Sequence, residues 1–238
     1  AAVARAAAAA ASPPSGKFLL RYFNGRGVVE GTRVMLALAG EDYEDFRYPI
    51  SWKVPDDMST VQREEFLADR AAGKMEVSMG MVPILEAGDF KLPQSKAIDR
   101  YVAARFGFMG STLEEGAWVD ALAEHLRDIN DAFGKKGTMF MKDKEKKKEL
   151  EDAWFGEELP ALLKKLEAAL PSSTEGFAVG DKVSLADVLI FRLLKDSAPD
   201  RDASSFAAGC PKLLAIAEHV AGLEPVMKWM STRPQTST

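Results

Sequence analysis

The sequence has very few of the residues that build disulfides and metal sites. It contains one cysteine, Cys210, and two histidines, His125 and His219, among 238 residues. A single cysteine excludes an internal disulfide framework and a CxxC redox pair. The two histidines stand in no zinc-binding spacing, so we expect no metal site. Cys210 is interpreted as a small buried apolar residue, which fits a reducing compartment.

The sequence also lacks a long apolar run and a strong excess of either charge. No stretch of about 18 apolar residues occurs, which excludes a transmembrane helix. Lysine and arginine number 31 against 36 acidic residues, which gives a formal net charge of -5. A mildly acidic chain is a poor general binder of nucleic acid. The composition is that of a globular protein with one large or two small domains.

Residues 1–16, AAVARAAAAAASPPSG, are rich in alanine, contain one arginine and have no acidic residue. This composition resembles the end of a transit peptide and equally a flexible extension. We therefore expect the protein in the cytoplasm, or in plastids if the segment is a transit-peptide remnant. The folded part is expected to begin at Lys17.

A strand, a helix and a second strand are predicted at the start of the folded part. The short apolar run 17–23 predicts a buried strand. Residues 28–39 place apolar side chains on one helical face, and Gly40 suits the end of that helix. Residues 42–48 alternate as a second strand would. A β-α-β unit of this kind predicts two parallel strands.

A long polar connection over residues 49–76 follows, with a helix expected at 59–72. Gly88-Asp89 then predicts a two-residue turn between two antiparallel strands. The next helix is expected to have Ser95 as its N-cap and to end at Gly107. The order β-α-β-α-β-β-α therefore predicts a mixed four-stranded sheet over residues 17–107.

Strand patterns stop beyond residue 113. Apolar residues from Trp118 to Phe133 recur at helical spacing, and a second helical stretch at 144–170 contains Pro160, which is expected to kink or divide it. SLAD at 184–187 resembles a capping box that begins a further helix. We therefore expect an all-helical second domain at residues 113–238.

The glycines after the first predicted strand allow a different interpretation. Gly25, Gly27 and Gly31 stand at a spacing close to that of a dinucleotide-binding loop, and Glu44 and Asp45 lie where a ribose-binding acid would be expected. A dinucleotide-binding domain needs further βαβ units, however, and here an antiparallel hairpin follows. A dinucleotide-binding oxidoreductase is therefore the remote alternative.

Five stretches carry a resemblance to glutathione transferases: RYFNGRG, VPILE, LPQSKAIDRYVA, VSLAD and RPQT. From about Lys17 onward the chain resembles the sigma class, which includes glutathione-dependent prostaglandin D synthases and S-crystallins. The resemblance implies a thioredoxin-like domain followed by an all-helical domain. It also implies a homodimer that uses glutathione as co-substrate and no metal.

Tyr22 is the catalytic residue that the resemblance implies. A free thiol has a pKa of about 8.5, so a group that stabilises the thiolate increases the reactive fraction at neutral pH. A neutral phenol can donate a hydrogen bond to the thiolate because its own pKa is near 10. On residue type alone, an aromatic residue that merely ends a strand is the favoured interpretation of Tyr22; the accompanying motifs favour catalysis.

The resemblance also implies where glutathione binds. The Val82-Pro83 bond would be cis, and the backbone at Met81-Val82 would pair with the cysteinyl part as an added strand. Gln94 and Ser95 at a helix N-terminus would bind the γ-glutamyl carboxylate, and Asp128 of the partner subunit would meet the γ-glutamyl amine. Phe23, beside Tyr22, is a further candidate.

The glycyl end of glutathione is assigned to Lys74, which occupies the position of a family lysine. The family has a tryptophan four residues earlier, where this chain has Arg70, so Trp52 or Arg70 would take its role. Val28 stands where the sigma class often has an arginine that supports the thiolate. Arg26 lies two residues before it. Turnover could therefore be reduced here even if binding survives.

The sequence thus predicts an enzyme that activates glutathione for attack on a small hydrophobic electrophile or for isomerisation of a lipid peroxide. The alternative is a structural or assembly subunit with the same fold and little or no activity. Residues 135–148 hold seven lysines. We interpret them as a solvated helix start or a mobile loop, with docking to an anionic surface as the second possibility.

Overall fold

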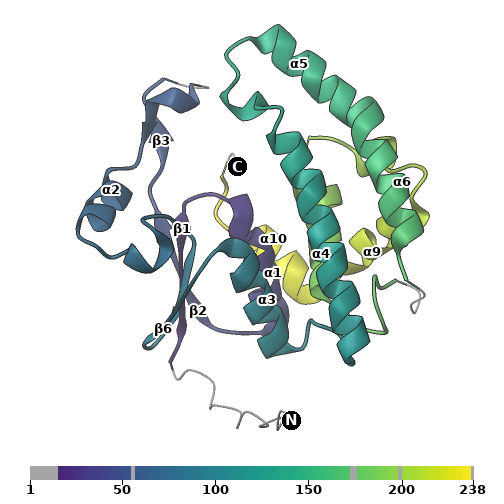
Figure 1. The fold of residues 1–238 in the computed structure, drawn as a ribbon, viewed down its shortest axis with the longest axis horizontal. Coiled ribbons are helices and arrows are strands. Elements are labelled where there is room, and N and C mark those ends of the chain that lie inside the picture. Colours follow the sequence, from purple (N-terminus) through teal and green to yellow (C-terminus); the bar gives the residue numbers. More distant parts are fainter. Residues whose placement is uncertain (1–15, 55–56, 172–175, 198–199, 237–238) are drawn as a thin grey trace, which may run out of the picture.

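The computed structural model describes residues 16–54, 57–171, 176–197 and 200–236. The extension expected at residues 1–16 therefore lies outside the described residues, apart from Gly16. Figure 1 shows a half that contains the sheet beside a half made of helices. Within the described ranges, no helix combines the length and the apolar character that crossing a membrane requires.

A mixed sheet of four strands in the order β2-β1-β5-β6 organises the first half. β1 (Phe18–Phe23) runs parallel to β2 (Tyr43–Tyr48) and antiparallel to β5 (Ile84–Ala87). β5 in turn pairs antiparallel with β6 (Phe90–Pro93), and Gly88 between them has φ 59°. The predicted sheet, its parallel first pair and its hairpin are confirmed.

Each face of the sheet packs on a different set of apolar residues. Leu20 of β1 and Leu85 of β5 belong to the main core, together with residues of α1 (Glu30–Ala39) and α3 (Ser95–Phe106). Tyr48 and Ile84 belong to a smaller cluster with Phe66 of α2 (Glu64–Ala71). Because successive strand residues point to opposite faces, these short strands are covered on both sides.

The predicted ends of α1 and α3 are confirmed, but the predicted start of α3 is corrected. α1 and α3 end at Gly40 and Gly107, both left-handed, as predicted. Ser95, however, is not the N-cap of α3, because it already belongs to the first turn. The N-cap is Gln94, whose φ of 73° turns the chain out of β6 and into the helix.

The connection between β2 and α2 is more ordered than expected, and the helix predicted over residues 59–72 is too long. β3 (Ser51–Trp52) pairs antiparallel with β4 (Val61–Gln62), and α2 begins only at Glu64. Thr60 Oγ1 accepts from the Val54 N–H at 3.0 Å and donates to the Asp57 carbonyl at 2.7 Å. Such local side-chain bonds compete with helical hydrogen bonds.

In the second half, the regular elements among the described residues are all helices. Two short π-helical stretches interrupt its pattern, Trp154–Glu158 after α5 and Arg192–Asp196 after α7. Pro160 lies in the first turn of α6, where proline is tolerated, so the division expected at Pro160 falls just before it. The helices are α4 (Leu113–Gly134), α5 (Lys144–Ala153), α6 (Leu159–Ala169), α7 (Leu185–Phe191), α8 (Ala203–Phe206), α9 (Pro211–Ala221) and α10 (Glu224–Thr232).

α7 is fully buried and joins the two halves. The predicted capping box at its start is present, with Ser184 as N-cap and Asp187 at the third helical position. α7 packs on α1 and α3 of the first half and on α4 and α9 of the second. A methyl group on Gly31 of α1 would lie 3.4 Å from Leu189 of α7, so the glycine lets these two helices approach closely.

Candidate functional site

Three segments of chain meet at one edge of the sheet. Arg21 of β1 pairs with Ile84 of β5, and Ile84 pairs with Pro93 of β6. The Val82–Pro83 bond just before β5 is cis, as the resemblance implied. The register therefore brings together, immediately beyond this row, six of the residues singled out from the sequence: Tyr22, Phe23, Val82, Pro83, Gln94 and Ser95.

Tyr22 lies half-buried at this edge, with its hydroxyl against Gly27. A methyl group built on Gly27 would be 2.5 Å from Tyr22 Oη and 2.8 Å from the ring, and Gly27 has φ +44°. Within the part of the chain that the structure describes, no group hydrogen-bonds the Tyr22 hydroxyl. The hydroxyl is therefore free to donate to a ligand. From the sequence, Gly27 was interpreted only as part of a possible dinucleotide-binding loop, and not as a neighbour of Tyr22.

The residues expected at the glycyl end lie in the connection before β5. Arg70, at the end of α2, is close to the turn at Gly80, where an added methyl group would meet Arg70 Nε at 3.2 Å. Lys74 Nζ lies 2.7 Å from Asp69 Oδ1. Hydrogen bonds from Lys74 and Tyr48 hold the pKa of Asp69 below its usual range. Lys74 therefore already has a carboxylate partner.

Two other candidates occupy different surroundings. Trp52 lies in β3, and its indole nitrogen is buried without a hydrogen-bond partner among the described residues. Met81, directly before Val82, is exposed. The structure thus gives Trp52 and Arg70 separate places in the same connection, and it joins neither to Tyr22 by a direct contact.

Asp128 is not brought to the Tyr22 edge within one chain. It is an exposed residue of α4 whose nearest cation is Arg127 at 3.4 Å. It borders a cavity of about 330 Å³ between α4 and α6 that is otherwise mainly apolar, with Ile129, Leu162 and Leu166 in its wall. A role for Asp128 at the Tyr22 edge therefore requires a second subunit.

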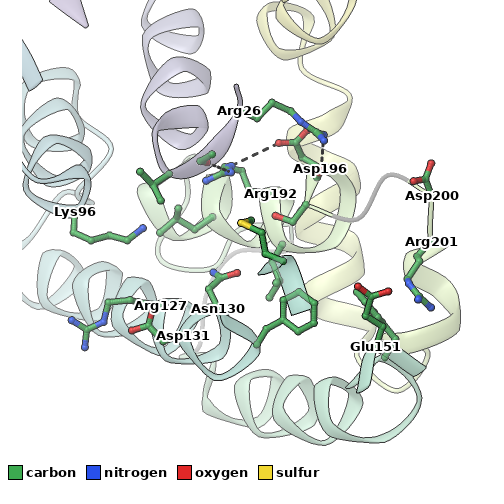
Figure 2. A pocket seen from close by; sticks show the side chains of 18 residues that line it. Arg26, Lys96, Arg127, Asn130, Asp131, Glu151, Arg192, Asp196, Asp200 and Arg201 are labelled. Carbon is green, nitrogen blue, oxygen red and sulfur yellow. Dashed lines mark hydrogen bonds and ion pairs between the residues drawn. The ribbon is translucent and has the colours of Figure 1, made fainter. Parts of the chain in front are cut away.

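A larger cavity, of about 640 Å³, opens between the two halves beside Gly27. Figure 2 shows its wall, which includes the β1–α1 connection at Arg26–Val28, Lys96 of α3, and residues of α4 and α5 and of the turn after α7. Its volume is within the usual range for small-molecule sites. The sequence did not identify most of its residues because they come from segments far apart in the chain.

The upper wall of this cavity in Figure 2 is built around the buried carboxylate of Asp196. Three guanidinium groups surround Asp196, with nitrogen–oxygen distances of 2.7 Å from Arg233, 3.3 Å from Arg26 and 3.8 Å from Arg192. Arg233 also lies 2.8 Å from Glu30 at the start of α1. Arg26 is thus turned toward Asp196, while Val28 is exposed at the cavity.

Asp99 of α3 is a second buried carboxylate in this region. Thr32 donates a hydrogen bond to its Oδ1 at 2.6 Å, whereas its Oδ2 has no hydrogen-bond partner in the described ranges. Lys96 Nζ lies 3.6 Å away. Burial raises the pKa of Asp99 despite the attraction of Lys96. Ionising Asp99 in the folded protein therefore costs stability.

Asp99→Asn is expected to become more stable relative to the wild type as the pH rises. A raised folded-state pKa means that the contribution of Asp99 is fully favourable below the ordinary carboxyl pKa of about 3.9 and is lost as pH rises through the folded value. An asparagine at this position does not ionise and cannot undergo that loss. Urea unfolding of both proteins at about pH 5 and about pH 8 measures the difference. A difference in stability that does not change with pH would contradict this.

The described residues contain no group of three or more histidine, cysteine, aspartate or glutamate side chains placed to hold a metal ion. Cys210 is buried, and burial raises the pKa of its thiol.

Comparison with known proteins identifies relatives along nearly the whole chain. Residues 19–104 match the family described as "Glutathione S-transferase, N-terminal domain", and residues 130–233 match "Glutathione S-transferase, C-terminal domain". The chain is 32% identical over 233 residues to "Probable glutathione S-transferase 5" of Caenorhabditis elegans, with 92% of this chain and 98% of the relative covered. It is 30% identical over 225 residues to "S-crystallin SL11" of Nototodarus sloanii, with 92% and 98% covered.

A solved structure agrees with these sequence matches. The Nu-class glutathione transferase of Haemonchus contortus superimposes with a TM-score of 0.74 at 29% identity, and the match covers 93% of this chain and 99% of that one. The expected thioredoxin-like domain followed by a helical domain is therefore confirmed.

Proposed function

Because the chain belongs to the glutathione S-transferase family, we propose that it activates the thiol of glutathione for attack on an electrophile. The observation that carries the proposal is the unpaired Tyr22 hydroxyl, among the described residues, at the sheet edge beside a cavity between the two halves. The Tyr22 hydroxyl can donate a hydrogen bond to a thiolate without first breaking a hydrogen bond within the described part of the protein. The donated hydrogen bond would make the thiolate the dominant form.

The backbone around Tyr22 supports the binding of a short peptide. We infer that glutathione lies along the edge next to Val82, where the chain before β5 offers backbone groups to an added strand. The N-terminus of α3 at Gln94-Ser95 would attract the γ-glutamyl carboxylate. Lys74 and Arg70 are the cations available to the glycyl carboxylate, and Asp128 of a second subunit would meet the γ-glutamyl amine.

The reaction then needs few groups from the protein. The thiol proton leaves to solvent and the thiolate sulfur attacks the electrophilic carbon to form a C–S bond. In a substitution the leaving group departs with the electron pair of its bond. In an addition the π bond opens and the neighbouring carbon takes a proton from solvent. Apolar side chains that include Val28, Phe133 and Leu189 would hold the body of a small hydrophobic electrophile. Isomerisation of a lipid peroxide by the same thiolate is included in the proposal, as is a sigma-like assignment within the family.

Calorimetric titration with glutathione, followed by turnover of 1-chloro-2,4-dinitrobenzene, tests the proposal. Binding together with turnover above the uncatalysed rate supports the enzyme. Binding without turnover supports the alternative of a structural subunit, which the similarity to an S-crystallin and the presence of Val28 favour. Absence of glutathione binding overturns the proposed enzyme function, including the isomerisation.

Gly27→Ala is expected to lower turnover by about tenfold to a hundredfold, since displacement of a catalytic group by about 1 Å has effects of this size. The added methyl group would overlap the Tyr22 hydroxyl and displace it. Gly40→Ala is the matched control, because Gly40 also has a positive φ but nothing within 4 Å of the added methyl group. Steady-state kinetics of both variants make the comparison. Equal losses in the two would assign the effect to backbone strain alone.

We also propose that the chain forms a homodimer. Met79 is 84% exposed, and its neighbours Val77 and Met81 are exposed too, which is unusual for adjacent apolar residues. The apolar cavity between α4 and α6, beside Asp128, is of a size to receive one such side chain. Pairing these two surfaces around a two-fold axis would also carry Asp128 toward the glutathione site of the other subunit.

Met79→Asp is expected to convert the dimer to a monomer in analytical ultracentrifugation. Met79 has φ 54°, a conformation that aspartate tolerates, so the substitution adds charge without backbone strain. Met227→Asp on α10 is the control, because Met227 is 52% exposed but lies outside the proposed contact. A Met79→Asp protein that remains dimeric would exclude this surface.

A further inference from the structure

The cavity between the two halves carries more charge than an apolar substrate requires. At the end next to Gly27, the cationic side chains Arg26, Lys96 and Arg192 reach its wall. The carboxylates that pair with them, Asp196 and Asp99, are each only 2% exposed, whereas Arg26, Arg192 and Lys96 are 16%, 15% and 36% exposed. The charge presented to a ligand at this end is therefore positive.

This positive charge is not fully compensated by the described part of the protein. Ion pairs connect five arginines to only three carboxylates, namely Arg26, Arg33, Arg47, Arg192 and Arg233 to Glu30, Asp45 and Asp196. With the pair between Lys96 and Asp99 included, six cations face four carboxylates, so two positive charges are in excess in a region that is largely buried. Burial without a full set of counter-charges is costly, and a bound anion would offset that cost.

Arg192 has the largest unused capacity among these arginines. The only hydrogen bond of its guanidinium within the described residues goes from Nη2 to the Gly27 carbonyl, at 2.8 Å. Its Nε is buried without a hydrogen-bond partner in the same ranges, and its nearest carboxylate oxygen, 3.8 Å away, belongs to Asp196, which Arg26 and Arg233 also contact. Gly27 also lies against the Tyr22 hydroxyl. Arg192 therefore contacts the same residue as the hydroxyl that is proposed to bind the thiolate.

The opposite end of the cavity has the other sign. Glu151 and Asp200 line it, while Arg201 there lies over the ring of Phe155 at 4.1 Å. Asp131 lies beside Arg127 on the Lys96 side (Figure 2). Figure 2 shows Glu151 and Arg201 at the side away from Lys96. An anionic ligand would therefore be oriented, with its charged group toward Arg192 and Lys96 and away from Glu151 and Asp200.

We propose that the second substrate of this protein is an electrophile with a carboxylate group, which is held by Arg192 and Lys96 while the electrophilic carbon faces the thiolate. The proposal rests on the proposed transferase function and names the substrate class of that site. A guanidinium pairs with a carboxylate through two parallel hydrogen bonds, which fixes the orientation of the substrate as well as its position. Arg26 adds to the attraction through its field.

The step can be written with a carboxylated aryl halide. The thiolate sulfur attacks the ring carbon that bears chlorine, a C–S bond forms, the C–Cl bond breaks and chloride leaves with the electron pair. The thiol proton has already passed to solvent, and the carboxylate is unchanged. No oxidant or further reactant is needed.

The test compares 4-chloro-3,5-dinitrobenzoate with its methyl ester, which removes the charge and keeps the ring and the leaving group. For each compound, kcat/KM at saturating glutathione is divided by the uncatalysed rate constant. We expect this ratio to be about tenfold or more higher for the acid, as a charge-assisted hydrogen bond provides. Added salt should lower the value for the acid far more than the value for the ester.

Variants then assign the preference to the two cations. Arg192→Met and Lys96→Met should each reduce the acid-to-ester ratio about tenfold, and Arg192→Lys should retain part of it. Arg105→Met, on α3 and outside the cavity, is the control with an unchanged ratio. Both Arg192 and Lys96 are replaced so that, if one variant folds poorly, the other still tests the preference for the acid.

A preference for the ester, or a ratio unchanged in both Arg192→Met and Lys96→Met, overturns the inference. If neither compound is turned over, the proposed transferase function is wrong. The carboxylate preference is then tested separately, by measuring ligand binding. Calorimetry with 3,5-dinitrobenzoate and its methyl ester, which have no leaving group, should then still show tighter binding of the acid and loss of this difference in Arg192→Met or Lys96→Met. Equal binding of acid and ester would overturn the inference in that case.

Discussion

Replacing Tyr22 with phenylalanine is expected to lower turnover by about 10²- to 10³-fold, the effect of removing one well-placed donor from an electrostatic site. The phenyl ring keeps the packing on Phe23, where the ring centroids lie 5.7 Å apart, so the change removes the hydroxyl alone. Glutathione affinity should change little, because the other contacts of the tripeptide come from the backbone near Val82 and from the start of α3.

The pH dependence distinguishes loss of thiolate stabilisation from misplacement of the substrate. Without the Tyr22 hydroxyl, the pKa of the bound thiol should rise toward about 8.5, the value of a free thiol. Ultraviolet absorbance of the bound thiolate as a function of pH measures this shift. Tyr101→Phe is the control, because the Tyr101 hydroxyl is a buried group without a hydrogen-bond partner in the described residues. Unchanged turnover or an unchanged thiol pKa in Tyr22→Phe would refute the assignment.

Asp187→Ala is expected to lower the free energy of unfolding by about 4 kcal/mol, since each unsatisfied buried donor costs about 1–3 kcal/mol. The buried Asp187 carboxylate accepts the Ala178 N–H at 2.7 Å and the Ser184 N–H at 2.8 Å, and it also accepts the Ser184 hydroxyl. Alanine would leave all three donors without a partner at the start of the helix that joins the two halves.

Denaturant unfolding of the wild type, Asp187→Ala and Ser184→Ala measures the effect. Ser184→Ala removes one of the three donors and the side-chain acceptor of the Asp187 N–H, but it leaves the two backbone bonds to the Asp187 carboxylate, so a smaller loss is expected. Equal losses in the two variants would mean that Asp187 stabilises the protein through its bond with the Ser184 hydroxyl, and that its two backbone hydrogen bonds contribute little. The loss should also exceed that of an ordinary helix cap, which is about 1 kcal/mol.

The sequence was informative wherever the deciding interaction is local. The Gly88-Asp89 turn, the left-handed Gly40 and Gly107, and the capping box at Ser184 each depend on residues within a few positions of one another. The helix expected at 59–72 was wrong at its start because Asp57 and Thr60 bind neighbouring backbone groups instead, and Ser95 was misassigned because a glutamine seldom takes a positive φ.

The site was only partly accessible to sequence reasoning, and the reason is distance along the chain. The edge with Tyr22, Val82 and Gln94 follows from strand order and could be assembled from motifs. The cavity beside it depends on Arg26 meeting Asp196, 170 residues away, and on Arg192 meeting Gly27, 165 residues away. No periodicity or motif connects such pairs. In the sequence, only the short separation between Gly27 and Tyr22 indicates that Gly27 could lie at the site.

The ion pair between Arg233 and Glu30 connects the end of α10 to the start of α1 in the first half. Glu30 is buried and also accepts a hydrogen bond from Trp229 of α10 at 2.8 Å, so both of these C-terminal partners neutralise or satisfy a carboxylate at the start of α1. Loss of these two residues would leave Glu30 Oε1 buried without either of its donors, so the C-terminal segment helps to stabilise the first turn of α1.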